Sequence, residues 1–431
     1  MTVFHDRDLE TLGAEALRDH QWARLQSLAD AIHPANAFVT RKWRSAGVQS
    51  AGDLRSWDDF FRLPLTTKTD LVDDQAAHPP FGTNVTFPLA EYVRVHQTSG
   101  TTGTPLRWLD TQASWNWWAH CWAFVLRGAG LGPEDRVFFP FSFGLFIGLW
   151  SGFEGAHAIG CLVIPGGGQD SAHRLATIES LGATAICCTP SYALHLAEVA
   201  RERGVDLRKL GVRVTVHAGE PGAGIPSVRA RIEEAWGARA YDHAGMTEMG
   251  AYGYECEAQA GLHVNESEFI AEVLDPATGR AAREGELVLT NLGRAGSPLL
   301  RYRTGDRVRL GSGSCACGRT FARLEGGILS RVDDMLVVRG VNVFPSALEG
   351  IVRRFAAVDE FTIEVYRRSE MDEVRLLLEV QGGAAGVPVA VQEAVRVDLG
   401  IRVEVVTVPL GSLPRYELKA RRLVRRAGEP R

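Results

Sequence analysis

Short apolar runs alternate with longer amphipathic stretches through the middle of the chain. The runs end in glycine or proline and span residues 161–168 (CLVIPGGG), 183–191 (ATAICCTPS) and 212–222 (VRVTVHAGEPG). The stretches 171–182, 192–204 and 225–237 between them have the apolar spacing of helices. Buried strands that alternate with helices predict a largely parallel sheet. Ligands bind such sheets at the carboxyl ends of the strands, which here carry Gly, Pro and Glu.

The pattern changes further along the chain, and this change predicts a second domain. Residues 111–131 are predicted to form a helix with four tryptophans in the core. Beyond residue 271, strands separated by turns replace the alternation, and after Asp333 two strands, a helix over 388–399 and a strand follow. We therefore expect an α/β fold. It would comprise a large N-terminal domain (1–332) of mixed and parallel sheets flanked by helices, and a small α+β C-terminal domain (333–431).

Residues 137–153 (VFFPFSFGLFIGLWSGF) form a stretch without a charged side chain. It is slightly short for a membrane span, and Pro140 and several glycines interrupt it. We interpret it as a buried or pocket-lining segment and expect no membrane association.

Composition and charge narrow the class of protein. The chain has 431 residues, of which 45% are hydrophobic and 23% charged, as in a globular protein of more than one domain. A net charge of −5 without a basic block gives no general affinity for nucleic acid. The N-terminus lacks the apolar core of a signal peptide, so the seven cysteines indicate reduced thiols and a cytoplasmic location.

The stretch 93–108 (VRVHQTSGTTGTPLRW) concentrates threonine, serine and glycine in one loop. It lacks the Gly-Lys-Ser/Thr ending of the Walker loop, and no G-x-G-x-x-G follows a strand. Its backbone N–H groups and hydroxyls suit phosphate oxygens. The same composition also suits a solvated linker, so the loop alone leaves both interpretations open.

Four further stretches favour phosphate binding: HAGEPG (217–222), YDHAGMTEMG (241–250), LLRYRTGDRVRL (299–310) and SRVDDMLVVRGVNVFPSALEG (330–350). With the threonine-rich loop, their order and spacing resemble the adenylate-forming superfamily of acyl-CoA synthetases. The greatest likeness is to its phenylacetate–CoA ligase branch, which 141–168 and 339–350 resemble specifically. The resemblance implies a large N-terminal domain, a small mobile C-terminal domain and an active site between them, in agreement with a boundary at Asp333.

The resemblance also assigns residues to ATP, Mg²⁺ and coenzyme A. Glu248 would bind Mg²⁺, Thr247 would contact the α-phosphate, and Asp306 would accept both ribose hydroxyls. Arg331 would reach the phosphates or the ribose, and Gly340 would line the channel for the coenzyme A thiol. The other predicted nucleotide contacts are Thr98, Ser99, Gly100, Thr101, Thr102, Gly103, Gly219, Glu220, Pro221, Tyr241, Asp242, His243 and Ala244.

Lys419 matches the C-terminal catalytic lysine of the family, whose ammonium bridges the attacking carboxylate and the α-phosphate. Asp333 would be the hinge between the domains. The chain departs from the family pattern at several positions. Thr104 and Leu106 replace Lys and Thr, Ala244 replaces a tyrosine that stacks on adenine, and Leu418 replaces a glycine. His243 or Tyr241 would have to supply the missing ring.

The acid would bind in an apolar pocket formed by Phe141, Phe143, Gly144, Phe146, Gly245 and Met246. Cys256, His263, Cys315 and Cys317 together make a donor set suited to structural Zn²⁺. Reduced cysteines without metal explain this sequence nearly as well. Some ligases of the branch bind zinc at matching positions, and the resemblance therefore favours zinc.

These inferences predict a ligase that activates an aromatic carboxylic acid as its acyl-adenylate and then transfers the acyl group to coenzyme A. Two alternatives stay open. One is the same adenylation with a carrier-protein thiol or an amine as acceptor. The other is a catalytically inactive nucleotide-binding protein, which the missing loop lysine and Ala244 would suit. Homodimers are common in the branch, and a homodimer is expected for this chain by analogy only.

Overall fold

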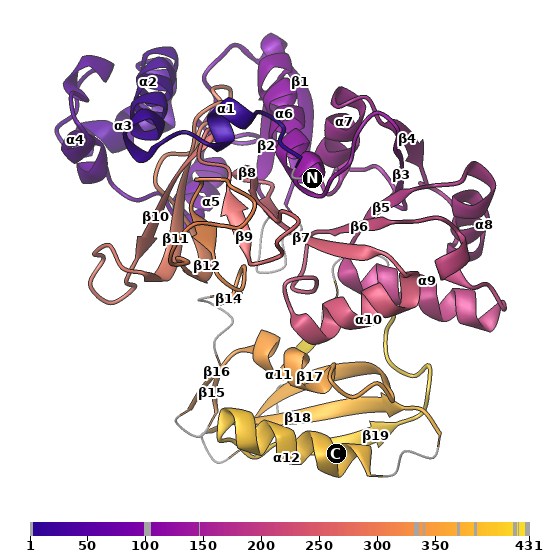
Figure 1. The fold of residues 1–431 in the computed structure, drawn as a ribbon. Helices are drawn as coiled ribbons and strands as arrows, with labels where there is room; N and C mark the ends of the chain where they lie inside the picture. Colours follow the sequence, from indigo (N-terminus) through magenta and orange to yellow (C-terminus); the bar gives the residue numbers. More distant parts are fainter. Residues whose placement is uncertain are drawn as a thin grey trace.

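The computed structural model describes residues 3–98, 105–145, 147–331, 336–338, 341–368, 371–382, 386–416, 420 and 422–426. A large N-terminal domain of mixed sheets and helices lies above a smaller C-terminal domain (Figure 1). The fold class predicted from the sequence is therefore confirmed. The predicted boundary at Asp333 falls outside the described residues and stays a prediction.

An eight-stranded sheet forms the centre of the large domain, in the order β13-β9-β8-β7-β6-β5-β3-β4. The strands from β7 to β4 are parallel, as the alternating pattern predicts, and the remaining pairs are antiparallel. The strands are β3 (Arg136–Phe139), β4 (Leu162–Pro165), β5 (Ala185–Cys188), β6 (Val214–His217), β7 (Arg239–Met246), β8 (Gly250–Tyr254), β9 (Leu262–Val264) and β13 (Arg323–Leu324).

The helices that connect these strands begin and end where the sequence provides capping residues. In α9 (Pro190–Glu202), Thr189 accepts a hydrogen bond from the Tyr192 N–H and Pro190 occupies the first turn. Gly182 ends α8 (Ser171–Leu181) in the left-handed conformation, with a φ of 58°. The other helices of this part are α6 (Gln112–Gly128), α7 (Trp150–Ala158) and α10 (Pro226–Trp236). The four tryptophans of α6 are buried in the main core, as predicted.

Two smaller sheets and a helical segment complete the large domain. The antiparallel sheet comprises β10 (Phe269–Leu274), β11 (Glu284–Asn291), β12 (Tyr302–Arg309) and β14 (Ser330–Arg331). A hairpin pairs β1 (Tyr92–Gln97) with β2 (Arg107–Thr111). The N-terminal helices are α1 (Arg7–Glu10), α2 (Ala14–Ile32), α3 (Ala37–Ser45), α4 (Trp57–Arg62) and α5 (Lys68–Ala77), with short 3₁₀ turns at Ala51–Asp53 and Leu89–Glu91. A third 3₁₀ turn, Leu207–Lys209, lies between α9 and β6.

The small domain has a sheet and a hydrophobic core of its own. Its strands are β15 (Leu336–Val338), β16 (Val341–Val343), β17 (Val358–Arg368), β18 (Met371–Val380), β19 (Glu404–Val408) and β20 (Leu423–Arg426). Its helices are α11 (Pro345–Val352) and α12 (Val387–Leu399), and the latter matches the helix expected over 388–399. Apolar residues of the strands and both helices pack together, so this domain is stabilised largely from within.

The uncharged segment 137–153 spans β3, a loop and the start of α7. Phe138, Phe139 and Phe141 within it are buried, in agreement with a core or pocket-lining segment. Across the described part of the chain, no helix combines the length and apolar character that a membrane crossing requires.

Candidate active site

The turn between β7 and β8 carries Thr247 and Glu248, and a buried arginine fixes it. Arg294 donates from Nη1 to the Thr247 and Glu248 carbonyl oxygens, at 2.7 and 3.0 Å. Its Nε and Nη2 donate to both oxygens of Asp110 on β2, at 2.7 and 2.8 Å. Burial alone would raise the pKa of Asp110, but Arg294 and His96 hold it below its ordinary value. This bidentate pair makes the turn a rigid platform.

The Glu248 carboxyl is almost completely buried, with 8% of the residue exposed. Burial raises its pKa, although the positive charges of Lys68, Arg331 and Arg294 act in the opposite direction. A carboxylate oxygen is a ligand that Mg²⁺ prefers, so the donor chemistry of Glu248 fits the predicted Mg²⁺ site, which stays a prediction.

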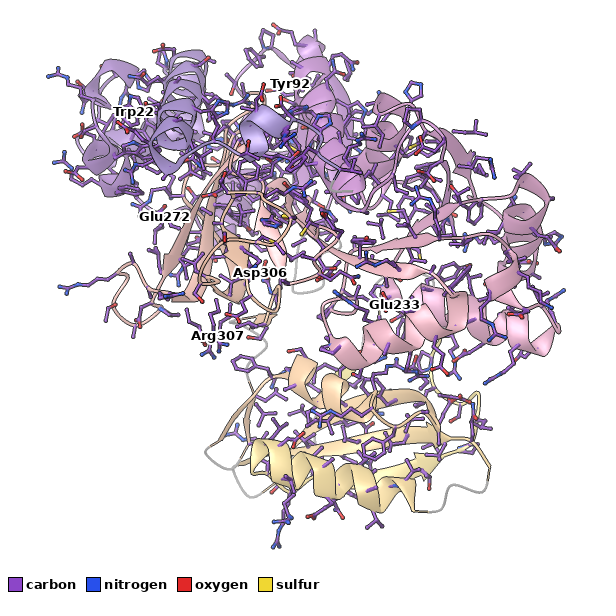
Figure 2. The ribbon with its side chains drawn as sticks, in the orientation of Figure 1. Trp22, Tyr92, Glu233, Glu272, Asp306 and Arg307 are labelled. Carbon is purple, nitrogen blue, oxygen red and sulfur yellow. The ribbon has the colours of Figure 1, made fainter. Side chains whose placement is uncertain are left out.

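Asp306 lies on β12, toward the side of the large domain that faces the small domain (Figure 2). Its Oδ2 accepts a hydrogen bond from the Tyr252 hydroxyl at 2.9 Å, and its Oδ1 accepts one from Arg331 Nη1 at 3.1 Å. Gly305 before it has a φ of 74°, a conformation that favours glycine. Asp306 and Arg331, both predicted site residues, are thus brought together.

Tyr252, Asp110 and Arg294 belong to this site but were missed from the sequence. Tyr252 lies 54 residues from Asp306, and Arg294 lies 184 residues from Asp110. No local spacing connects such pairs, because the sheets bring them together only in the folded chain. In the structure, Arg294 is recognised as part of the site by its burial and by the aromatic rings around it. Its guanidinium lies 5.1 and 5.3 Å from the rings of Trp108 and Trp118.

The middle of β7 carries the predicted adenine-binding residues 241–244. Asp242 approaches the backbone so closely that a Cβ on Gly224 would lie 2.6 Å from its Oδ2. Desolvation, together with the charge of Glu255, raises the pKa of Asp242 to about 8. Glu255 itself accepts hydrogen bonds from the Asp242 N–H and from Arg229. At neutral pH the Asp242 carboxyl is therefore mainly uncharged.

His243 lies on β7 next to Asp242 and is held against α6. Its Nδ1 donates to the Gly253 carbonyl oxygen at 2.7 Å, and its ring lies 4.3 Å from that of Trp122. Burial lowers the pKa of His243 to about 4, so its ring is neutral. Tyr241 and Ala244 are also buried, and Ala244 packs closely on Gly253, where an added Cβ would lie 3.1 Å from the Ala244 Cβ.

Aromatic rings gather where β3 ends, around the predicted pocket residues Phe141 and Phe143. Phe143 contacts Phe141, Trp150 and Phe153, with ring centroids 5.6, 4.2 and 5.4 Å apart. The Trp150 Nε1 donates to the carbonyl oxygen of Gly144, another predicted pocket residue. Phe141 is buried, Phe143 is half-buried and Gly144 is exposed, which gives an apolar wall with an open side. The other two described pocket residues, Gly245 and Met246, end β7.

Several predicted site residues lie outside the described part of the chain: Ser99, Gly100, Thr101, Thr102, Gly103, Phe146, Asp333, Gly340 and Lys419. Thr98, at the start of the threonine-rich loop, is described. Its N–H donates to the Leu106 carbonyl oxygen at 2.9 Å, and its Oγ1 accepts from the Leu106 N–H at 3.0 Å. Thr98 therefore closes the base of the loop.

Gly219, Glu220 and Pro221 follow β6. Gly219 has a φ of 94°, which allows the chain to turn sharply after the strand. The Glu220 carboxylate is oriented toward α9 and the small domain, where it accepts hydrogen bonds from the backbone N–H groups of Ser191 and Ala420.

The predicted zinc residues Cys256, His263, Cys315 and Cys317 are buried together, with their donor atoms within 4.8 Å of one another. Cys256 Sγ lies 3.6 Å from Cys315 Sγ, and Cys317 Sγ lies 3.5 Å from His263 Nε2. The His263 Nδ1 lies 3.2 Å from the Phe321 carbonyl oxygen, which fixes the tautomer that presents Nε2 to the sulfurs. All of these cysteines are free thiols.

The family assignment follows from comparison with known proteins. Residues 68–293 match the model of the AMP-binding enzyme family, and residues 340–426 match that of the AMP-binding enzyme C-terminal domain. The chain belongs to the AMP-binding enzyme family. Within it the chain is an AMP-forming acid–CoA ligase, which activates an acid with ATP and then forms the coenzyme A thioester.

The relatives extend over nearly the whole chain. A phenylacetate-coenzyme A ligase of Thermus thermophilus is 35% identical over 442 residues, which cover 96% of this chain and 97% of the relative. The structure of 2-hydroxyisobutyryl-CoA ligase in the postadenylation state superposes with a TM-score of 0.91 at 34% identity, covering 97% and 91% of the two chains. The same ligase in the thioesterification state gives a TM-score of 0.73 at 35% identity, with the same coverage.

Proposed function

We propose that this ligase activates an aromatic carboxylic acid. The acid carboxylate attacks the α-phosphorus of ATP and pyrophosphate leaves. The thiol of coenzyme A then attacks the acyl carbonyl carbon and AMP leaves. One observation carries the assignment of the site: Asp306 accepts hydrogen bonds from Arg331 Nη1 at 3.1 Å and from the Tyr252 hydroxyl at 2.9 Å, which together fix the predicted ribose-binding carboxylate beside a predicted phosphate-binding arginine.

The proposed roles follow from this geometry. Asp306, oriented by Tyr252 and Arg331, would accept the ribose hydroxyls. Glu248 would hold Mg²⁺, which when bound neutralises phosphate charge. The Arg294–Asp110 pair keeps the turn with Thr247 and Glu248 in place while charge builds at the α-phosphorus. Lys419 would supply the cation for the attacking carboxylate, as the family resemblance implies.

The aromatic rings around Phe143 support an aromatic acid. The Thermus relative is named for phenylacetate, an aryl acid, whereas the structural neighbour acts on 2-hydroxyisobutyrate, a small aliphatic acid. Edge-to-face contacts with a substrate ring would add to the affinity for the aryl acid. We therefore propose phenylacetic acid or a close aryl analogue as the substrate.

Pyrophosphate exchange into ATP tests this assignment with phenylacetate, benzoate, cinnamate and 2-hydroxyisobutyrate. We expect at least one aryl acid to support exchange with a kcat/KM at least about tenfold above that of 2-hydroxyisobutyrate. Lys419→Ala should depress the exchange about 100-fold or more while ATP still binds. A preference for the aliphatic acid would contradict the aryl assignment, and unchanged exchange in Lys419→Ala would contradict the role of the lysine.

We also propose that Cys256, His263, Cys315 and Cys317 bind structural Zn²⁺. In a tetrahedral site with metal–sulfur bonds of about 2.3 Å, two sulfurs lie about 3.8 Å apart. The 3.6 Å between Cys256 and Cys315 is close to this value. Thiolate ligands require reducing conditions, which supports a cytoplasmic location. Asp333 as the domain hinge, with a domain boundary between 332 and 333, and a homodimer remain predictions.

A further inference from the structure

Glu220 links the two domains through one carboxylate. Its Oε1 accepts a hydrogen bond from the Ser191 N–H at 2.8 Å, and its Oε2 accepts one from the Ala420 N–H at 2.5 Å. Ser191 lies in the first turn of α9 in the large domain, whereas Ala420 belongs to the small domain. Each oxygen of the carboxylate therefore serves a different domain.

This arrangement suits the charge of the group. The first backbone N–H groups of a helix have no partner within the helix, and the helix dipole favours a negative charge beside them. The helix N–H groups and the helix dipole therefore stabilise the Glu220 carboxylate at the start of α9 whether or not the small domain is docked. Its second oxygen then receives a charge-assisted hydrogen bond from the Ala420 N–H, which is stronger than a neutral one.

A second contact joins the same turn of α9 to the same segment of the small domain. The Arg422 Nη2 donates to the Ser191 Oγ at 2.9 Å. Arg422 is held within its own domain by Glu360, at 2.8 and 3.0 Å, and by Glu349 at 3.2 Å. Because carboxylates of its own domain pair Arg422, its contact with Ser191 involves only a neutral hydroxyl. The large domain contributes two carboxylates to this joint: Glu220, and Glu198 on α9, which pairs with Arg415 of the small domain at 3.5 Å.

The position of Ala420 in the sequence connects this contact with the adenylation half-reaction. Ala420 directly follows Lys419, the lysine proposed for the first half-reaction. The domain arrangement seen here superposes well on a postadenylation state and much less well on a thioesterification state, with TM-scores of 0.91 and 0.73. The Glu220–Ala420 hydrogen bond therefore belongs to the arrangement associated with adenylation and would break when the small domain rotates.

We propose that Glu220 is a positioning residue for adenylation, which docks the backbone beside Lys419 onto the start of α9. The proposal rests on the proposed function, since it requires two half-reactions in different domain arrangements. If Glu220 positions the small domain, its substitution should change kcat for adenylation. If Glu220 instead contacted adenine, its substitution should change the affinity for ATP.

Glu220→Gln tests the proposal, because an amide has one acceptor oxygen and cannot serve both N–H groups. We expect kcat for pyrophosphate exchange to fall about 10- to 100-fold, with the KM for ATP unchanged. Thioester formation from supplied acyl-adenylate and coenzyme A should stay within about twofold of the wild type. Small-angle X-ray scattering should show a larger radius of gyration for the free variant.

Glu233→Gln is the matched control. Glu233 on α10 (Figure 2) also accepts a backbone hydrogen bond, from the Ala240 N–H on β7 at 2.9 Å, but α10 and β7 both belong to the large domain. This variant should match the wild type in both half-reactions and in scattering. Unchanged exchange in Glu220→Gln, a raised KM for ATP alone, or equal loss of both half-reactions would each overturn the proposal.

A separate outcome tests the proposed function. If the wild-type protein supports no exchange with any acid, the ligase substrate assignment fails. The proposed docking of the small domain by Glu220 is then tested by small-angle X-ray scattering alone. Identical scattering profiles for Glu220→Gln and the wild type would overturn that proposal.

Discussion

Asp242 lies in the middle of β7 beside Glu255, and this pair determines how stability at the site depends on pH. The pKa of Asp242 is raised from 3.8 to about 8, first by desolvation and then by Glu255. The folded state therefore binds more protons than the unfolded state between these two pH values. Stability consequently falls as pH rises from about 4 to about 8 and changes little from this group beyond that range.

Asp242→Asn should remove this part of the pH dependence, because the amide stays neutral throughout. We expect the variant to exceed the wild type at pH 8 by about 1–3 kcal/mol in free energy of unfolding, and to match it more closely at pH 5. Urea unfolding at both pH values measures the difference. An equal difference at both pH values would show that the carboxyl does not titrate in this range.

At the scale of elements, the Arg294–Asp110 pair joins β2 to the turn between β7 and β8. Both side chains are fully buried, so removal of one charge leaves the other without compensation. Asp110→Asn should therefore lower the free energy of unfolding by about 3–5 kcal/mol and reduce adenylation along with it.

Urea unfolding checks this prediction, with Glu393→Gln as the control. Glu393 pairs with Arg396 on the exposed face of α12, and loss of this pair should leave stability nearly unchanged. Similar unfolding curves for the two variants would mean that the buried pair does not stabilise the turn.

The cysteine–histidine set joins a different group of elements. Cys256 follows β8, His263 lies on β9, and Cys315 and Cys317 lie in the loop between β12 and β13. A bound zinc ion would therefore cross-link the central sheet to the loop after β12. We expect about one zinc per purified chain, and a fall of roughly 5–10 °C in melting temperature after chelation.

Cys317→Ser should abolish zinc binding, whereas Cys161→Ser should retain it. Cys161 is also buried but lies far from the set in sequence, with its Sγ hydrogen-bonded to the Gly132 carbonyl oxygen. Metal analysis of both variants gives a result that does not depend on activity. Absence of zinc from the wild type would leave these residues as ordinary buried thiols.

At the scale of the whole molecule, the sequence predicts regular elements well because periodicity is a local property. The helices expected over 171–182 and 225–237 are Ser171–Leu181 and Pro226–Trp236 in the structure. The predicted parallel sheet is also present, since its short apolar runs flanked by helices permit few other folds.

The candidate site is only partly predictable from the sequence, because it depends on contacts between residues that are distant in the chain. Motifs give the residues that would contact a ligand, but the groups that hold them come from distant parts of the chain. Tyr252 and Arg294 carry no local signal of their roles. The partner of Glu220 lies 200 residues further along, in another domain. Such contacts depend on tertiary arrangement, which the spacing of motifs does not encode.

The way in which Arg422 is neutralised has a consequence for the rate of turnover. Since its counter-ions Glu349 and Glu360 lie in the same domain, Arg422 keeps both of them when the domains separate. The contacts broken on undocking include the hydrogen bonds at the start of α9, which water can replace, and the ion pair between Glu198 of α9 and Arg415 of the small domain at 3.5 Å. Such a joint should open and reclose many times per second, and because part of the attraction is between charges, its equilibrium should shift toward the open arrangement as ionic strength rises.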